Sequence, residues 1–402
     1  MVIHARSFAK INLGLCIGAL RTDGFHELRT VYQTIALHDV IQVSVERGSG
    51  IEIRCENPRV PTDSTNTCFK IVTLAMAALK ARGRVVIEIE KRLPVQGGLG
   101  GASGNALAAL LALETALGKE LSPAMRLRIT AEVGSDVPLF LIAGTVLGVG
   151  RGEEVYPLPD LPSMPCVVAT PEVAVSTPKA FADWDRLWGA GAPVRQAILA
   201  TGAAFSDSGT GKGTASSRAV SRHHDVRALA PEELAEQSSA WTGEGARPHV
   251  DRHHTGSEKL TSATHSDRMS EFSREISAWL SAAPGRAGRR RSGVSARGGG
   301  RAENPLLDLV RTGIENDFEK VVFPQFPELR EVKSVLARAG ARYASLSGSG
   351  SAVYGLFDSR DKAAAAAKKL SQSGNAAVVT STLTRRQYWK RFQIEDSTRI
   401  SD

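Results

Sequence analysis

Hydrophobic and polar residues follow two different periods along the first part of the chain. Alternation with a period of two over residues 5–17, 40–45 and 85–89 predicts strands, because successive side chains of a strand point to opposite faces. Hydrophobic residues spaced three and four apart over 68–81 and 103–117 predict helices. Strands and helices therefore alternate in this part of the chain.

A second series of elements follows towards the C-terminus. The same patterns predict helices over 306–318, 327–339 and 362–373, and strands over 352–357 and 376–382. Prolines between 157 and 165 mark a division into two lobes. We therefore expect an α+β fold, with an N-terminal lobe over 1–160 and a C-terminal lobe over 161–402.

The segment 190–303 differs from both flanks in composition. Ser, Gly, Ala, Arg and Thr dominate it, and 231–240 and 270–280 are its only stretches with helical character. Residues 195–301 hold 16 basic and 11 acidic side chains, which account for five of the net eight positive charges of the chain. We interpret 190–303 as a largely disordered basic insertion, and the Arg-rich run 286–301 as a solvated linker rather than a nucleic-acid site.

Composition excludes several classes of protein. With 402 residues, 42% of them hydrophobic and 23% charged, the chain is globular. The longest uncharged apolar stretch, 137–150, is shorter than the roughly 18 residues that a membrane span needs, and the N-terminus has no signal-peptide pattern. Four scattered cysteines fit reduced thiols, so we expect a cytoplasmic protein.

A glycine-rich segment at 94–105 is the first candidate for chemistry. It lies between a predicted strand and a predicted helix, so its backbone N–H groups can converge on an anion at a helix N-terminus. The segment matches neither the P-loop nor the dinucleotide-binding fingerprint. It predicts a phosphate site, the alternative being a turn that only packs a helix on a strand.

Three further features complete an inventory for phosphoryl transfer. Lys10 and Asn12 share the polar face of a hydrophobic strand, which indicates a polar cleft, although an edge-strand lysine can also serve solubility. Asp136 lies in a Gly-Ser-Asp turn, where it could equally cap a helix. A second glycine loop, 347–351, precedes a strand. Two anion-cradling loops, one cation and one carboxylate suffice for phosphoryl transfer without a covalent intermediate.

The sequence resembles the GHMP kinase superfamily. The segments that carry the resemblance are 9–13 (AKINL), 94–105 and 346–351. Within the superfamily, 21–28 (RTDGFHEL), 134–138 and 316–319 resemble the kinases of a cytidine-diphosphate-linked methylerythritol. The match covers 1 to about 185 and 304 to about 385, and leaves the insertion uncovered.

The resemblance implies an ATP-dependent kinase that phosphorylates the substrate's 2-hydroxyl in non-mevalonate isoprenoid synthesis. It implies a two-lobed fold, with an N-terminal lobe similar to ribosomal protein S5 domain 2 and a ferredoxin-like C-terminal lobe. Magnesium is expected with the ATP. By position, Asp136 is the implied general base and Lys10 its partner. The implied ATP-binding residues are Pro94, Gly97, Gly98, Leu99, Gly100, Gly101, Ala102, Ser103 and Asn105, and the implied substrate-binding residues are Asn12, Phe25, His26, Thr177, Phe181, Gly348, Ser349 and Gly350.

The chain departs from the family pattern at four positions. Phe25 stands where Tyr is usual, which keeps an aromatic face and removes a hydroxyl. Gln96, Ala102 and Gly104 replace a small residue, Gly and Ser, so this chain lacks the second serine that the family pattern places near the phosphates or metal.

Three other functions stay open at this point. Another GHMP kinase, of the homoserine or mevalonate type, would be indifferent to the cytidine. A non-catalytic ligand sensor on the same fold would bind nucleotide without turnover. A polyanion-binding protein acting through the Arg-rich insertion would bind with a steep salt dependence.

Overall fold

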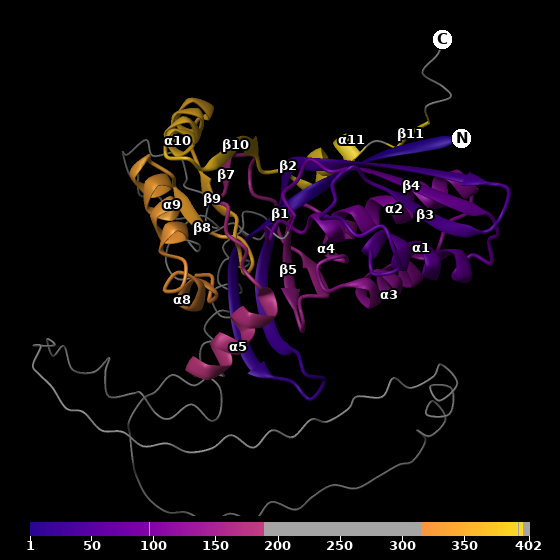
Figure 1. The fold of residues 1–402 in the computed structure, drawn as a ribbon, viewed down its shortest axis with the longest axis horizontal. Helices are drawn as coiled ribbons and strands as arrows, with labels where there is room; N and C mark the ends of the chain where they lie inside the picture. The colour runs from indigo at the N-terminus through magenta and orange to yellow at the C-terminus, as the bar shows by residue number, and fades with distance from the viewer. Residues whose placement is uncertain (96, 189–314, 393, 397–402) are drawn as a thin grey trace, which may run out of the picture. The chain divides into compact units, whose positions relative to one another are not determined.

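The computed structural model describes residues 1–95, 97–188, 315–392 and 394–396, which belong to one compact unit. In this part the chain forms two β-sheets with helices packed against them (Figure 1). The first sheet has the order β11-β1-β2-β4-β3, with β5 joined to β2 and β6 to β5. The second has the order β10-β7-β9-β8.

The first sheet is built on a long antiparallel hairpin. Its strands are β1 (Val2–Leu20), β2 (His26–Glu46), β3 (Gly50–Arg54), β4 (Arg84–Glu90), β5 (Thr145–Val149), β6 (Glu154–Pro157) and β11 (Glu395–Asp396). The helices α1 (Thr67–Ala78), α2 (Gly101–Leu117), α3 (Pro123–Val133) and α4 (Leu139–Ile142) accompany it. α2 is buried along most of its length because β1, β2 and α1 all pack against it.

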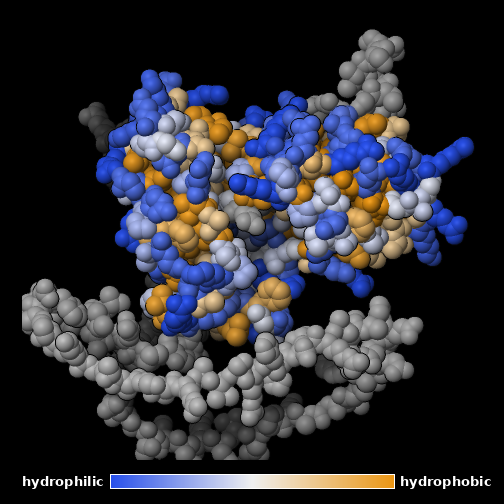
Figure 2. All heavy atoms as spheres, viewed as in Figure 1, coloured by the Kyte–Doolittle hydropathy of each residue, from blue (hydrophilic) through white to orange (hydrophobic). Residues whose placement is uncertain are grey.

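The second sheet consists of β7 (Pro165–Thr170), β8 (Tyr343–Leu346), β9 (Val353–Leu356) and β10 (Ala376–Ser381). Its helices are α5 (Thr177–Trp188), α8 (Glu319–Val322), α9 (Pro327–Arg338) and α10 (Arg360–Gln372), and α11 (Arg385–Phe392) returns to β1. Figure 2 shows hydrophilic residues over α10, whose apolar side, including Ala363 and Leu370, is buried.

The β1 strand contributes to three hydrophobic clusters in turn. Phe8 packs with α2, Ile11 packs against β7 and β9 between the two sheets, and Ile17 packs with residues of the second sheet. Its pairing with β2 shifts register after Phe8 and again after Asn12, and such irregularities re-aim side chains. The segment between these shifts carries the candidate residues Lys10 and Asn12.

Most predicted elements are confirmed within a few residues of their expected ends, including the strands over 5–17 and 85–89. The strand over 40–45 is the last third of a much longer β2. The prediction of a helix over 306–318 is wrong at its described end, because residues 315–318 form a bridge and a turn before α8. Most of that helix, Gln96, the insertion at 190–303 and its helical stretches lie outside the described residues.

The α+β class and the two-lobed arrangement are as expected, since the described residues form two sheets, each accompanied by its own helices. The division at 160 falls in the connection from β6 to β7, and the domain limits themselves stay a prediction. None of the described helices is long and apolar enough to cross a membrane.

Candidate active site

Lys10 lies where the edge of β1 meets the glycine-rich segment 94–105, hereafter the first glycine loop. One edge of β1 pairs with β2, and on the other edge the Lys10 N–H donates a 2.9 Å hydrogen bond to the Leu99 carbonyl. Lys10 is only 3% exposed, and burying an ammonium costs free energy unless it has hydrogen-bond partners. This burial argues against a role in solubility.

The ammonium of Lys10 has two oxygen partners. Its Nζ donates to Asn12 Oδ1 at 2.7 Å and lies 3.2 Å from Asp136 Oδ2. Because an ammonium only donates, the Asn12 amide must turn its oxygen towards Lys10. Its Nδ2 then donates to Thr30 Oγ1 at 2.8 Å, and the Thr30 hydroxyl donates to the Gly14 carbonyl. The chain of bonds fixes the direction of both polar side chains.

Asp136 comes to this cluster from the turn between α3 and α4. Its side chain is 31% exposed, so it is open to a substrate while one oxygen faces Lys10. Its Oδ1 accepts a hydrogen bond of 3.0 Å from the hydroxyl of Tyr32. Burial, together with the carboxylate of Asp136, raises the pKa of Tyr32 well above its ordinary value, so this hydroxyl stays a donor.

The first glycine loop lies against Lys10 at the start of α2. Gly98 and Gly100 have positive φ, and a Cβ on Gly100 would lie 3.0 Å from Cγ of Lys10. Glycine therefore lets the loop approach the lysine closely. A groove of about 320 Å³ runs along the loop. The structure brings together in its lining all nine residues implied for ATP: Pro94, Gly97, Gly98, Leu99, Gly100, Gly101, Ala102, Ser103 and Asn105.

Sequence reasoning missed a second lysine at this loop. Lys91 Nζ is paired with Asp39 Oδ2 at 2.5 Å, and a Cβ on Gly101 would lie 3.2 Å from that nitrogen. Asp39 also accepts from the backbone N–H of Arg92 and of Leu93, so it anchors the corner after β4. Because Asp39 neutralises its charge, Lys91 adds hydrogen-bond donors rather than net positive charge to the N-terminal end of α2.

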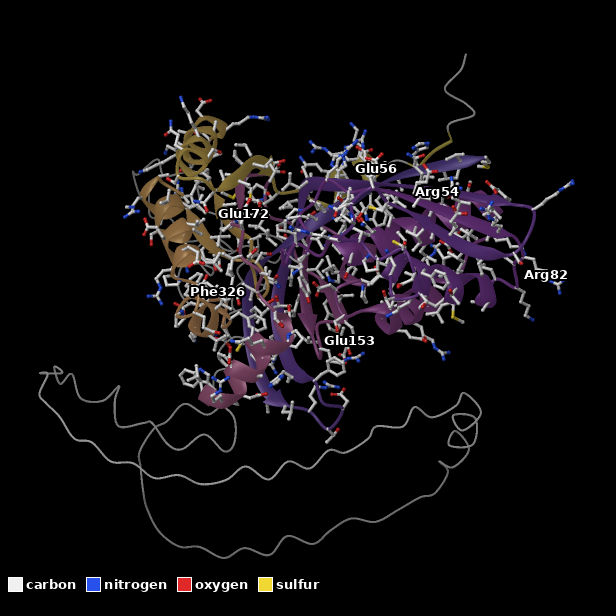
Figure 3. All side chains as sticks on the ribbon, in the orientation of Figure 1. Arg54, Glu56, Arg82, Glu153, Glu172 and Phe326 are labelled. Carbon is white, nitrogen blue, oxygen red and sulfur yellow. The ribbon has the colours of Figure 1, made fainter. Side chains whose placement is uncertain are left out.

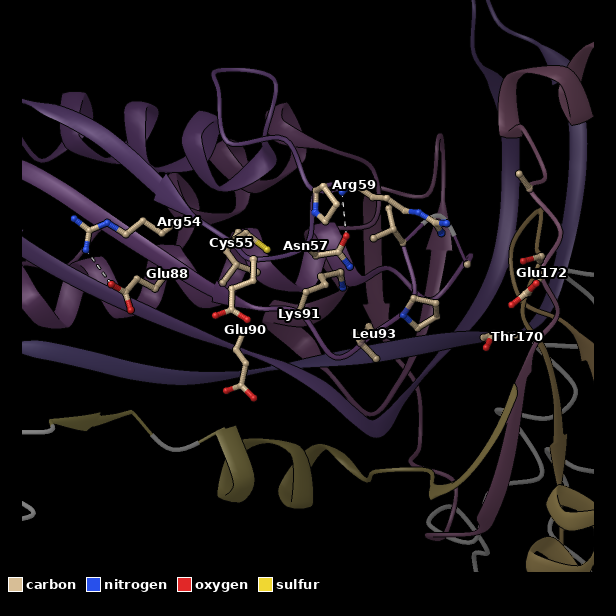
Figure 4. A pocket seen from close by; sticks show the side chains of 18 of the residues that line it. Arg54, Cys55, Asn57, Arg59, Glu88, Glu90, Lys91, Leu93, Thr170 and Glu172 are labelled. Atoms are coloured by element: carbon tan, nitrogen blue, oxygen red, sulfur yellow. Dashed lines mark hydrogen bonds and ion pairs between the residues drawn. The ribbon is translucent and has the colours of Figure 1, made fainter. Parts of the chain in front are cut away.

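A wider groove of about 1550 Å³ adjoins the first (Figure 4), and Arg59, Lys91 and Pro94 are among the residues that line both. Charged side chains of both signs line it. Figure 3 shows Arg54 and Glu56 on the side of the first sheet and Glu172 on the side of the second. Arg54 is already paired with Glu88, so the groove as a whole favours no single charge of ligand.

The second glycine loop packs directly on the first. Ser347 Oγ donates to the Gly98 carbonyl at 2.9 Å, and any Cβ on Gly98 would overlap the Ser347 carbonyl oxygen. Asn316 donates to the carbonyls of Leu346 and Gly348, so the segment 316–319 supports this loop. Ser349 Oγ lies 2.7 Å from Thr177 Oγ1. Four expected substrate-side residues, Thr177, Gly348, Ser349 and Gly350, therefore lie on or against this loop.

The turn between β1 and β2 brings a separate group of rings together with α5. The ring of His26 stacks on Phe181 with centroids 4.9 Å apart and planes 9° from parallel. Phe25 is 50% exposed, and the Arg151 guanidinium, which is paired with Glu153, lies 4.9 Å from its ring centroid. Phe25 and Phe181 are thus paired with other residues and not with each other.

Among the described residues, no group of three His, Cys, Asp or Glu side chains is arranged to hold a metal ion. A magnesium ion carried by a nucleotide does not require one, because it typically uses one or two protein oxygens with phosphates and water.

Known proteins that are similar to this chain are kinases, as the geometry of the site leads us to expect. The chain matches the GHMP kinases N terminal domain over residues 66–144 and the GHMP kinases C terminal model over 303–376. A 4-diphosphocytidyl-2-C-methyl-D-erythritol kinase from Solibacter usitatus is 30% identical over 98% of this chain and 93% of its own length. The chain belongs to the 4-diphosphocytidyl-2-C-methyl-D-erythritol kinase family. A family relative from Acaryochloris marina is also 30% identical, over 90% of this chain and 89% of its own.

Solved structures give the same family and fold. A 4-(cytidine 5'-diphospho)-2C-methyl-D-erythritol kinase superposes with a TM-score of 0.57 and 25% identity over 94% of this chain and 98% of its own. A homoserine kinase from Cytophaga hutchinsonii has the same TM-score at 15% identity, over 96% and 94%, and therefore shares the fold. Membership of this kinase family makes the chain an ATP-dependent small-molecule kinase.

Proposed function

We propose that the chain transfers the γ-phosphate of ATP to the 2-hydroxyl of 4-diphosphocytidyl-2-C-methyl-D-erythritol. The observation that carries this proposal is the contact of the buried Lys10 with the partly exposed Asp136, beside the glycine loop at the start of α2. The family relatives bear the name of this reaction. The pair provides a base for the hydroxyl, and the loop provides a cradle for the phosphates.

In this proposal Asp136 acts as the general base. The substrate oxygen attacks the γ-phosphorus, the bond from that phosphorus to the bridging oxygen breaks, and ADP leaves. The hydroxyl proton passes to the Asp136 carboxylate. The Lys10 ammonium, whose Nζ lies 3.2 Å from this carboxylate, is placed to polarise the attacking oxygen.

The groove along the glycine loop suits a nucleotide. Asn105 is buried there, and its Oδ1 has no hydrogen-bond donor in the part of the chain that the structure describes. A buried acceptor without a partner is costly, and an N–H group of a ligand would satisfy it. The Ser103 hydroxyl, in the first turn of α2, could hold magnesium together with phosphate oxygens, and the ion would neutralise charge on the phosphates.

The ring cluster would bind the cytosine. Phe25 offers an exposed aromatic face, and His26, stacked on Phe181, offers a ring nitrogen to the edge of the base. Asn12 and the second glycine loop, with Thr177, would place the methylerythritol diphosphate. We also place this activity in the cytoplasm, which is supported by four thiols that form no disulfide within the described residues.

A substrate panel tests the proposal. The protein is incubated with ATP and magnesium against the cytidyl-methylerythritol substrate, homoserine, mevalonate and galactose, and ADP release is followed. We expect turnover with the first compound alone. Turnover with one of the other three would reassign the kinase, and nucleotide binding without any ADP release would indicate a ligand sensor.

A further inference from the structure

Asp185 on α5 contacts the ring of His26 and is not among the residues expected from the sequence. His26 Nε2 lies 2.7 Å from Asp185 Oδ1. Phe181, which stacks on the same ring, precedes Asp185 by four residues, so both side chains lie on one face of α5. Phe181 therefore fixes the plane of the imidazole, and Asp185 fixes its rotation within that plane.

The carboxylate also determines where the ring hydrogen lies. An ionised carboxylate only accepts hydrogen bonds, so Nε2 must carry hydrogen to make this contact. In the neutral ring Nδ1 is then the acceptor. The side chain of His26 is 7% exposed, and its Nδ1 makes no hydrogen bond to any residue that the structure describes. A ligand can therefore supply the missing donor.

We propose that Asp185 is a positioning residue that makes His26 select a pyrimidine bearing an exocyclic amino group. This inference rests on the proposed function, because it concerns the base of the same substrate. Cytosine presents an N–H donor at position 4, and uracil presents a carbonyl acceptor there. The Nδ1 lone pair can accept a hydrogen bond from the amino group of cytosine. The uracil oxygen is itself an acceptor, so no hydrogen bond can form between it and Nδ1. A site discriminates strongly between two ligands when the wrong one would leave a buried polar group of the site without a hydrogen-bond partner.

The contact explains why an acidic residue is tolerated beside an aromatic cluster. The Asp185 side chain is 44% exposed, so its second oxygen can stay hydrated while the first holds the buried ring. The neighbouring acid Asp183 has a different role. It is buried and bound by Lys179 and Arg186 of the same helix and by Gln325, which ties α5 to the residues after α8.

The test compares the cytidyl substrate with its uridyl analogue in the wild type and in Asp185→Asn. An amide can meet Nε2 with either its oxygen or its nitrogen, so the substitution keeps the shape but frees the tautomer. We expect the wild type to prefer the cytidyl compound by about a hundredfold or more in kcat/KM, and D185N to lower this ratio by about tenfold or more. The change should be in KM, with kcat nearly unchanged, because Asp185 does not touch the reacting atoms.

A spectroscopic measurement gives an answer that does not depend on turnover. In protein with ¹⁵N-labelled histidine, with the His26 signals assigned through His26→Gln, the nitrogen shifts should report hydrogen on Nε2 and a bare Nδ1. D185N should shift them towards a mixture of tautomers, and Asp185→Glu, which keeps the carboxylate, should restore most of the wild-type pattern. The control is Asp361→Asn, the same change on an exposed residue of α10.

Each outcome separates the two proposals. If the wild type does not phosphorylate the cytidyl substrate, the proposed function fails, whatever the state of His26. If it does so with base selectivity, and D185N keeps that selectivity, Asp185 has no part in it. A wild-type ring with hydrogen on Nδ1, alone or on both nitrogens, would likewise overturn the inference.

Discussion

The hydroxyl of Tyr32 donates a 3.0 Å hydrogen bond to Oδ1 of Asp136, the carboxylate whose other oxygen lies 3.2 Å from Lys10. Both oxygens therefore have a partner on the protein, and the carboxylate cannot rotate without losing one. The Tyr32 ring fits because Gly148 and Gly152 lie against it, where a Cβ on either would come within 2.5 Å. The orientation of the expected base thus depends on a residue of β2 and on two glycines near β5.

Replacing Asp136 with Asn should abolish most of the activity. The amide keeps the shape of the side chain but cannot take a proton, so kcat should fall by roughly two to four orders of magnitude. Substrate affinity should change much less, because the loss is confined to the transition state. Steady-state kinetics with separate measurement of binding checks this.

Ser135→Ala in the same turn is the control, and it should retain near-normal turnover. A D136N protein that keeps more than about a tenth of the wild-type kcat would remove Asp136 from the mechanism.

Tyr32→Phe should lower kcat by about three- to tenfold and leave KM nearly unchanged. It removes one hydrogen bond, worth about 0.5–1.5 kcal/mol, and keeps the ring in its packing site. The matched control is Tyr343→Phe, which removes a partly buried hydroxyl that donates to the Leu13 carbonyl instead of to a carboxylate. If both variants lost the same fraction of kcat, the effect would be one of packing and not of orienting Asp136.

The elements rich in apolar residues were predictable because burial selects such residues, on nearly all sides of α2 and on both faces of part of β4. The helix over 103–117 and the strand over 85–89 each carry apolar residues at the spacing of one element, and the structure has them as α2 and β4. The central part of β2 was not predictable in this way. Thr30, Gln33 and Thr34 are polar yet fully buried, because side chains and backbone from distant segments satisfy them.

In the candidate site too, some residues could be predicted from the local sequence and others only from tertiary contacts. The glycine loop and Lys10 could be found because glycines at a helix start and a lysine inside an apolar strand are unusual locally. Tyr32 looks like any core aromatic, and Asp185 looks like a solvated acid on an amphipathic helix. Only the tertiary contacts to Asp136 and His26 give them a role. The sequence gives only a weak indication of a role for Lys91, which is a basic residue three positions before Pro94, the start of the glycine-rich segment.

Gly104 stands where a serine was expected, and the structure gives a reason. A Cβ there would lie 2.7 Å from the Phe8 carbonyl oxygen and 2.8 Å from Ser7 Oγ. Gly104→Ala should therefore destabilise the protein by about 1–3 kcal/mol, in spite of the better helix propensity of alanine. Thermal melts should show this against Gly134→Ala, whose Cβ would meet nothing closer than 3.5 Å. Equal melting temperatures for the two variants would mean that β1 and α2 separate without cost.

Stability should fall at alkaline pH because several buried groups resist ionisation. Burial raises the pKa of Cys68 from 9.0 to about 12, and it raises the pKa values of Tyr32, Tyr354 and Tyr388 above 10.0. In the unfolded chain these groups lose protons from about pH 9 to 10 upward, whereas the folded chain retains them. Their contribution to stability is thus complete below pH 9 and is lost as the pH rises towards the folded-state values. Melting temperatures measured from pH 8 to 11 should decline above about pH 9.5, with tyrosinate absorbance appearing together with unfolding. Tyrosinate formation by these residues in a protein that keeps its melting temperature would contradict their burial.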